Sequence, residues 1–460
     1  MPFFDAHQFA QEEYGRACLG HVSRLKRLVR IGAQLAQNPA ASIPTVFQNK
    51  HQSKGLYRFA SSSQVSHGKI ATAHFRATAE RSRSLKKVLV IQDTMHLSFG
   101  GRKSSDLGPV DTTGDSRGFL AHSALAVDAS TRRPLGLLGQ QVWVRSPKKR
   151  PEGETCEERK KRPRESEKWS SVSRQVEQQL HSLGSEKPRV VAVFDAEGDA
   201  FEAMETLDEL GHGFIIRASK NRLLEDEEDD HVYLVEAATA APHRGSLTVE
   251  IRRRPDRASR QARLELRATT IEIRPPKNRG RKGDSLEVSV VLATETNVPT
   301  GEEPVCWLLL TREPCRTSAE AADVVRDYAL RWLIEEFHMG LKTGCSIEDR
   351  QLQTFDALAN LLAICNPIAV GLLLLRHVAR TDREAPAEHV LNPFQLTALR
   401  RLRPKLPTLL SAYAALRSIA ELGGFLGRRS DGEPGWRTLW LGFRDILLAE
   451  RVLRADQGSG

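Results

Sequence analysis

Three acidic residues stand where they could bind metal ions together. Asp93 and Asp195 each follow directly on a mostly apolar run, at 88–92 and at 190–194. Glu335 lies further along, in a segment with helical periodicity. Carboxylate oxygens suit Mg²⁺ and Mn²⁺, and two such ions can clamp the attacking and leaving oxygens of a phosphodiester. These residues predict a two-metal site formed by Asp93, Asp195 and Glu335.

The segment around Glu335 predicts a helix with one polar and one apolar face. At about 100° per residue, four polar residues fall in one narrow stripe: Tyr328, Arg331, Glu335 and Lys342. Apolar residues fall on the opposite side: Leu330, Leu333, Ile334, Phe337 and Leu341. Cationic and phenolic groups beside a metal-binding glutamate would hold the phosphates of an anionic substrate. The alternative interpretation is a solvated face of ion pairs within the helix.

The order of the predicted elements favours an α/β fold with an RNase H-like catalytic core. Strands are expected at 88–93, 119–128, 134–145, 190–195 and 214–217, and helices at 168–183 and 199–211. Strands alternating with crossover helices, with acids at the strand ends, are typical of such a core. The strand-rich region 246–311 predicts a β-insertion between Asp195 and Glu335. Further helices are expected at 354–378, 393–401, 407–423 and 433–455.

The length of 460 residues allows two to three domains. We expect a helical, DNA-end-binding domain over 1–75 and a catalytic core over 76–378, with its β-insertion at about 222–311. A helical C-terminal dimerisation region is expected over 379–460. Within the first domain, residues 6–40 are expected to be helical, and residues 44–80 to continue as helix and loop.

The basic character of the chain fits a polyanionic partner. The net charge is +10, and residues 1–70 carry nine Lys or Arg against three Asp or Glu. Candidate phosphate contacts in this region are Arg24, Lys26, Arg27, Arg30, Lys54 and Arg58. The alternative is a plain solubilising surface.

Three further patterns bear on the class of protein. Residues 357–375 are nearly long enough to span a bilayer. Asn360, Asn366 and Pro367 interrupt that run, so a buried helix is the favoured interpretation and no membrane is expected. Six consecutive acids at 225–230 predict a solvated loop rather than a metal cluster. The six cysteines have no zinc or redox spacing and predict free thiols, and no signal peptide is expected.

The same residues occur in one order in a known family. The chain resembles the DDE transposases of the IS-four insertion-sequence family, whose YREK signature matches Tyr328, Arg331, Glu335 and Lys342. The resemblance runs through 42–43, 56–59, 91–94, 116–118, 122–123, 165–169, 195–199, 307–311, 331–338 and 423–425, with Trp436 and Trp440. Ala196 and Met95 depart from the family's pattern, and neither departure removes a metal ligand.

The resemblance implies a cut-and-paste DNA transposase. Such an enzyme binds inverted-repeat ends, cleaves through a hairpin with two Mg²⁺ (or Mn²⁺) ions per site, and joins 3′-OH ends to target DNA. It further implies that Trp307 stacks on an unstacked base and that Arg217 binds phosphate, as Tyr328, Arg331 and Lys342 would. The alternative for Trp307 is an ordinary core tryptophan. Expected partners are double-stranded DNA and a second copy in a synaptic homodimer, in the bacterial cytoplasm at the nucleoid.

Two other functions stay open at this point. A catalytically silent, transposase-derived DNA-binding regulator is disfavoured by the intact acids Asp93, Asp195 and Glu335. A structure-specific nuclease on the same core is disfavoured by the β-insertion and by the polar stripe of the predicted helix.

Overall fold

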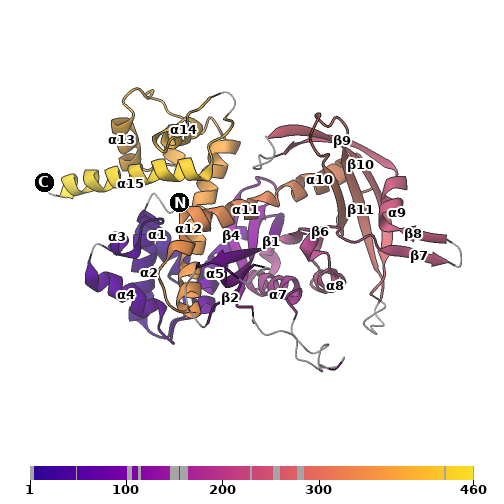
Figure 1. Ribbon diagram of the computed structural model, residues 1–460, viewed down its shortest axis with the longest axis horizontal. Helices are drawn as coiled ribbons and strands as arrows, with labels where there is room; N and C mark the ends of the chain where they lie inside the picture. Colours follow the sequence, from indigo (N-terminus) through magenta and orange to yellow (C-terminus); the bar gives the residue numbers. More distant parts are fainter. Residues whose placement is uncertain are drawn as a thin grey trace.

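One mixed β-sheet runs through the middle of the molecule, with helical regions from both ends of the chain gathered beside it (Figure 1). The computed structural model describes residues 5–47, 49–100, 106–111, 115–145, 155, 164–227, 230–251, 259–276, 284–428 and 431–458. An N-terminal helical region, a central mixed sheet and a C-terminal helical region follow one another along the chain. The predicted α/β architecture is therefore confirmed.

The N-terminal region is a set of short helices rather than one long one. They are α1 (Ala6–Tyr14), α2 (Val22–Gln37), α3 (Ile43–Phe47), α4 (Lys50–Ala60) and α5 (His67–Ser82). The helical character predicted for residues 6–40 is confirmed, with a turn that separates α1 from α2. Gly20 stands in this turn with φ +73, a conformation that favours glycine. Each later helix starts at a capping side chain; Asn49, for example, accepts the His51 N–H at 2.8 Å.

Ten of the described strands form one sheet with parallel strands at its centre. The strands are β1 (Lys87–Ser98), β2 (Gly108–Pro109), β3 (Arg117–Asp128), β4 (Pro134–Trp143), β5 (Arg189–Phe194), β6 (Gly213–Arg217), β9 (His243–Ile251), β10 (Arg260–Ile273), β11 (Leu286–Glu295) and β12 (Cys306–Thr311). Their order is β2-β3-β1-β5-β6-β12-β11-β10-β9, and β4 pairs with β3. β1 and β5, and β5 and β6, are parallel, and their neighbours are antiparallel. The predicted insertion thus extends the core sheet through the β6–β12 pairing.

Both faces of the central strands are covered. Leu89 and Ile91 of β1 belong to a core shared with the buried helix α12 (Phe355–Thr381), whereas Val88 and Val90 pack with α7 (Glu167–His181). Period-2 alternation sends successive side chains to opposite faces. Burial on both faces explains why the strand reads as a continuous apolar run. Two further helices, α8 (Phe201–Glu209) and α9 (Leu234–Ala240), complete the sheet region.

The segment that carries Glu335 is not a single α-helix, which corrects the prediction. α10 (Ser318–Ala329) ends before Leu330, α11 (Trp332–Met339) begins after Arg331, and a π turn occupies Gly340–Gly344. The apolar face was predicted correctly at Leu333, Ile334, Phe337 and Leu341, all of which are buried. Tyr328, expected on the polar stripe, is buried as well at 4% exposure.

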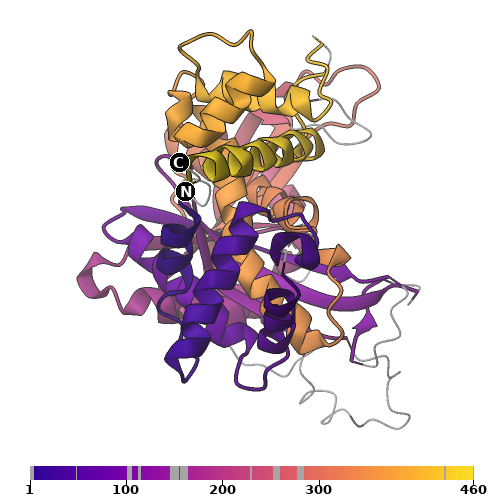
Figure 2. The same cartoon turned by 90° about the vertical axis from the view of Figure 1, so that its left-hand side faces the viewer.

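α12 runs through the molecule between the two terminal helical regions (Figures 1 and 2). Its span Phe355–Val378 is long and apolar enough to cross a membrane, but 94% of that window is buried inside the protein, as the prediction of a buried helix required. Tyr14 of α1 donates to the Ile364 carbonyl at 2.6 Å, and Asn360 donates to the Ala60 carbonyl at 2.9 Å. These bonds tie the N-terminal helices to the core.

The C-terminal region is helical, as predicted. It consists of α13 (Pro393–Leu402), α14 (Ala412–Leu422) and α15 (Trp436–Gly458). α15 packs along α13 and α14. Figure 2 shows α15 lying near the N-terminal end of the chain.

Some sequence predictions fall on segments that the structure describes only in part. The acidic run 225–230 continues β7 (Leu223–Glu227) and begins β8 (Asp230–Tyr233), which pair with each other, so the expected loop is partly a two-stranded ribbon. The side chains of that run, and most of the charged segment 146–168, lie outside the described residues. Five cysteines in the described part of the chain are free thiols: Cys18, Cys306, Cys315, Cys345 and Cys365.

Asn360→Ala should lower the free energy of unfolding by about 1–3 kcal/mol, because the buried Ala60 carbonyl loses its donor. Urea unfolding followed by circular dichroism measures the effect. Thr381→Ala, at the exposed end of the same helix, is the control and should change stability by no more than about 0.5 kcal/mol. Equal stability of the Asn360 variant and the wild type would contradict the assigned role of this bond.

Candidate active site

Asp93 and Asp195 are brought level by the parallel pairing of β1 with β5. In that pairing Ile91 lies opposite Val193, and each aspartate stands two residues further along its own strand direction. Asp195 follows the last residue of β5 and accepts the Glu197 N–H at 2.9 Å, which begins a short 3₁₀ turn. The two aspartates therefore lie side by side where β5 ends, whereas β1 continues to Ser98, beyond the strand end that the sequence predicted at Asp93.

The residues on either side of Asp93 take part in a buried series of hydrogen bonds that crosses the sheet. Thr94 Oγ1 lies 2.9 Å from His122 Nδ1, and His122 Nε2 lies 3.0 Å from Gln92 Oε1. Gln92 in turn donates to Ser173 Oγ of α7 at 3.0 Å. Burial holds the pKa of His122 well below its usual range, so this imidazole is neutral. The chain fixes the segment of β1 that carries Asp93.

The orientation of α11 decides which of two adjacent glutamates faces the aspartates. Glu336 is buried and pairs with Arg376 at 3.4 Å and Arg380 at 3.2 Å, both on α12. Glu335 points to the other side, toward the sheet edge, where it forms an ion pair with Arg331. Arg331 and Glu335 are four residues apart, a spacing at which side chains meet on one face of a helix.

The acidic residues repel one another. Burial, together with the neighbouring charges of Asp195 and Glu335, raises the pKa of Asp93 to about 6, although the Thr94 N–H and Arg331 act in the opposite direction. The Asp93 side chain is only 17% exposed. Three carboxylates thus share one poorly solvated region without full compensation of their charge.

The donors in this region suit a hard divalent cation, although they are not gathered around one point. Within the described ranges no three His, Cys, Asp or Glu side chains lie close enough together to hold a metal ion. Glu335 is ion-paired with Arg331 instead. The unrelieved repulsion on Asp93 is the charge that a cation would neutralise. The residues therefore fit a divalent ion once Glu335 turns away from Arg331.

A basic and aromatic cluster borders the acids. The rings of Trp307 and Tyr328 meet edge to face with their centroids 5.2 Å apart. Burial raises the pKa of Tyr328, against the opposing charges of Arg331 and Arg217, so this buried phenol lies among cations. Arg217, the last residue of β6, pairs with Leu309 of β12 in the sheet. Trp307 itself is partly exposed.

Lys342 lies at the far side of the site. Its Nζ is 3.2 Å from Glu348 Oε1, and the same carboxylate oxygen accepts the Ser98 N–H at 2.8 Å at the end of β1. Lys342 and Arg331 both act on His338, whose pKa falls to about 3 mainly through burial. Of the three predicted cations, Arg331 lies beside Asp93 and Glu335, Arg217 lies beside Tyr328, and Lys342 is paired with Glu348.

Three family models match the chain. Transposase DNA-binding matches residues 6–65, Transposase DDE domain matches 170–369, and Transposase Tn5 dimerisation domain matches 368–456. The chain belongs to the Tn5-like DDE transposases. The sheet region is accordingly an RNase H-like core, and the protein is a metal-dependent enzyme that cleaves DNA and transfers strands. Asp93 lies before the matched DDE segment and joins Asp195 only through the β1–β5 pairing.

His338 of this transposase was missed by the sequence reasoning. Its Nδ1 lies 3.9 Å from Asp93 Oδ2, and its buried Nε2 has no hydrogen-bond partner among the described residues. The signal that could have found it is the spacing from Glu335, because residues i and i+3 share one face of a helix. The imidazole of His338 is neutral and projects from α11 toward Asp93.

The predicted DNA contacts of the N-terminal region lie on its surface, with one exception. Lys26, Arg27, Arg30, Lys54 and Arg58 are exposed, and no ion pair to a carboxylate engages any of them in the described part of the chain. Arg24 is partly buried and donates to the Leu19 carbonyl at 2.9 Å, which holds the turn between α1 and α2. Arg24 therefore stabilises this turn and also adds to the positive charge of the surface.

Asp93→Asn should stabilise the metal-free transposase at neutral pH by about 1–3 kcal/mol, since one pKa unit corresponds to about 1.36 kcal/mol. Its folded pKa, about 6, exceeds the ordinary 3.8. Ionised Asp93 destabilises the folded protein. This destabilisation is absent when Asp93 is protonated in both the folded and the unfolded state, grows as pH rises from about 4 to 6, and is complete above 6. Urea unfolding in EDTA at pH 4 and pH 8 measures the difference.

The matched control is Asp323→Asn, a surface aspartate of α10 whose side chain is 65% exposed. It should leave the free energy of unfolding nearly unchanged at both pH values. A loss of stability in Asp93→Asn at pH 8 would show that the assigned electrostatic repulsion is absent.

Proposed function

We propose that this enzyme catalyses cut-and-paste transposition at inverted-repeat ends, through a hairpin intermediate and with two Mg²⁺ (or Mn²⁺) ions per site. The observation that carries the proposal is the meeting of Asp93 and Asp195 at one sheet edge, with Glu335 facing them. Asp93 and Asp195 would hold the first ion and Glu335 the second. When bound, such ions lower the pKa of an attacking water or 3′-OH and stabilise the leaving oxygen.

The cations around the acids would position the DNA strand. Arg331 faces Glu335 in the free enzyme, and a phosphate arriving at the site would compete for its guanidinium. Arg217 is carried by β6 and Lys342 by the π turn, and both would bind phosphates of the same strand. A strand gripped from three elements would keep its phosphodiester in place while the nucleophile changes from water to a 3′-OH.

A hairpin requires a sharply bent strand, which forms more easily when one base leaves the stack. Trp307 supports this step because its ring is partly exposed and held on one side by Tyr328. A ring fixed by an edge-to-face partner keeps its orientation when a base stacks on its free surface. We therefore assign Trp307 to the unstacked base and Tyr328 to its support.

The remaining assignments concern partners and domains. Residues 1–75 would recognise the ends through Arg24, Lys26, Arg27, Arg30, Lys54 and Arg58. The core would span 76–378, and residues 379–460 would join two copies in the synaptic complex. Two copies, each bound to one end, would then insert the paired ends into target DNA in the bacterial cytoplasm at the nucleoid.

Asp93→Ala, Asp195→Ala and Glu335→Ala should each bind an end-bearing duplex with near wild-type affinity but lose nicking in Mg²⁺ by at least about 100-fold, because each removes one ion ligand. A denaturing gel of a labelled end measures nicking, and a mobility shift measures binding. Asp323→Ala, on the exposed side of α10, serves as the control and should cut normally. Wild-type nicking by any one of the three variants would remove that residue from the site.

Trp307→Ala should slow hairpin formation by about 5- to 150-fold while first-strand nicking changes little, since base–aromatic stacking is worth roughly 1–3 kcal/mol. Nicked ends should accumulate on the gel. Trp307→Phe keeps an aromatic surface and should restore much of the hairpin yield. Equal slowing of both steps would instead indicate a tryptophan that only supports the core.

A further inference from the structure

A cavity of about 210 Å³ lies outside the active site, between the α1–α2 turn and α5. Its lining includes Arg16 and Cys18 from the turn and Lys69, Thr72 and Arg76 from α5. Three of these five side chains are cations and none is an acid. The cavity is therefore strongly positive, and none of the candidate DNA contacts predicted from the sequence belongs to it.

The three cations face the cavity without anionic partners. Lys69, Thr72 and Arg76 share one face of α5 because they are spaced i, i+3 and i+7. No described carboxylate forms an ion pair with Arg16, Lys69 or Arg76, all of which are exposed. Glu12 stands one helical turn before Arg16 but accepts a hydrogen bond from Gln8 at 2.9 Å instead.

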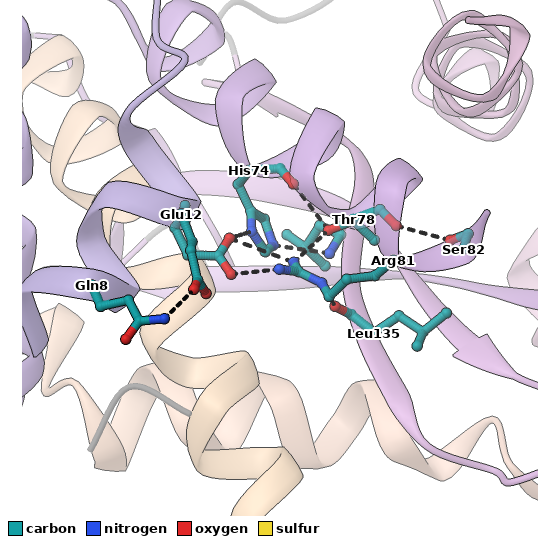
Figure 3. A network of polar contacts seen from close by, with 9 residues as sticks. Gln8, Glu12, His74, Thr78, Arg81, Ser82 and Leu135 are labelled. Carbon is teal, nitrogen blue, oxygen red and sulfur yellow. Dashed lines mark hydrogen bonds and ion pairs between the residues drawn. The ribbon is translucent and has the colours of Figure 1, made fainter. Parts of the chain in front are cut away.

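The walls of the cavity are held by a buried network (Figure 3). Glu13 of α1 accepts a bond from His74 at 2.5 Å and pairs with Arg81 at 2.7 Å, and both partners are on α5. His74 Nε2 accepts the Leu137 N–H of β4 at 3.0 Å, so its Nδ1 carries the proton given to Glu13. His74 and Arg81 keep the pKa of Glu13 at about 2 against its burial.

This network fixes α1 against α5 close to the residues that line the cavity. Glu13 precedes Arg16 by three residues, and His74 lies between Thr72 and Arg76. Arg81 also donates to the Leu135 carbonyl at 2.8 Å, which joins both helices to β4 of the catalytic sheet. The helices that carry the cations are therefore already fixed in place before a ligand binds.

The start of α5 contacts a strand residue that is aligned with Asp93 across the sheet. His67, its first residue, lies 2.8 Å from Gln140 through Nε2. Gln140 of β4 is opposite Ser123 of β3, and Ser123 is opposite Asp93 of β1. With strands about 5 Å apart, the backbone of Gln140 is roughly 10 Å from the backbone of Asp93. Lys69 follows two residues after His67, so the cavity lies within reach of a duplex that enters the active site.

We propose that this cavity binds a backbone phosphate of the DNA that the enzyme acts on. A phosphate accepts the forked bonds of a guanidinium and the point charge of an ammonium, which Arg16, Arg76 and Lys69 supply together. The proposal rests on the function proposed above for its choice of DNA as the source of the phosphate. Free orthophosphate offers the same chemistry and is distinguished by the experiments below.

The first experiment uses Cys18 as a reporter of the local charge, without DNA. Its exposed thiol should react with anionic iodoacetate faster, relative to neutral iodoacetamide, in the wild type than in the double variant Lys69→Gln/Arg76→Gln. Removal of two nearby charges should lower this ratio roughly threefold or more at low salt. Lys86→Gln, an exposed lysine before the start of β1, is the matched control and should leave the ratio unchanged. An equal ratio in all three proteins would overturn the anion site.

The second experiment measures binding of a duplex oligonucleotide as a function of salt. Loss of this one phosphate contact should reduce the slope of log K against log salt by about 0.9, so the double variant loses about threefold less affinity than the wild type between 50 and 200 mM salt. Lys86→Gln should keep the wild-type slope. Thermal unfolding of each protein shows that the exposed substitutions leave the fold intact.

The outcomes separate this proposal from the function on which it rests. If the wild type binds and cuts DNA but the double variant keeps the wild-type slope, the cavity proposal alone is overturned. If the slope is unchanged and orthophosphate raises the unfolding temperature of the wild type only, the site binds a free anion and the assignment to DNA is wrong. If the wild type binds no duplex, both proposals fail together.

Discussion

The parallel pairing of β1 with β5 is the constraint on which the active site depends. It sets Ile91 opposite Val193 and so brings Asp93 and Asp195, which are 102 positions apart in the numbering, to one edge. A register slip of one residue would turn one aspartate to the other face of the sheet. The buried hydrogen bonds of Gln92 to Ser173 and His122 oppose such a slip, because a slip would turn Gln92 toward the other core and break both.

The same burial has an energetic consequence for the acids. Asp93 ionises with difficulty, and Glu335 is held by Arg331 while Glu336 is held by α12. An apolar frame thus keeps carboxylates close together despite their repulsion, which a divalent cation would relieve. Function and stability are opposed at Asp93, as is common where charged groups must be preorganised.

The N-terminal helices are joined to this frame by polar contacts rather than by a hinge. Tyr14 and Asn360 link them to α12 and its neighbours, and Glu13 links them through His74 to β4. Buried networks of this kind hold a position firmly when every member is satisfied. The surface that carries the N-terminal cations is therefore oriented relative to Asp93 before DNA binds.

The sequence by itself determined the features that depend on local pattern. The end of β5 before Asp195, the apolar stretch of β1 that leads to Asp93, the apolar face of α11 and the burial of α12 follow from periodicities of 2 and 3.6 residues. Tertiary structure alone decided the break before Arg331, the burial of Tyr328 on Trp307, the approach of His338 to Asp93 and the meeting of Arg16 with Arg76. These depend on contacts between segments far apart in the chain, which local periodicity does not record.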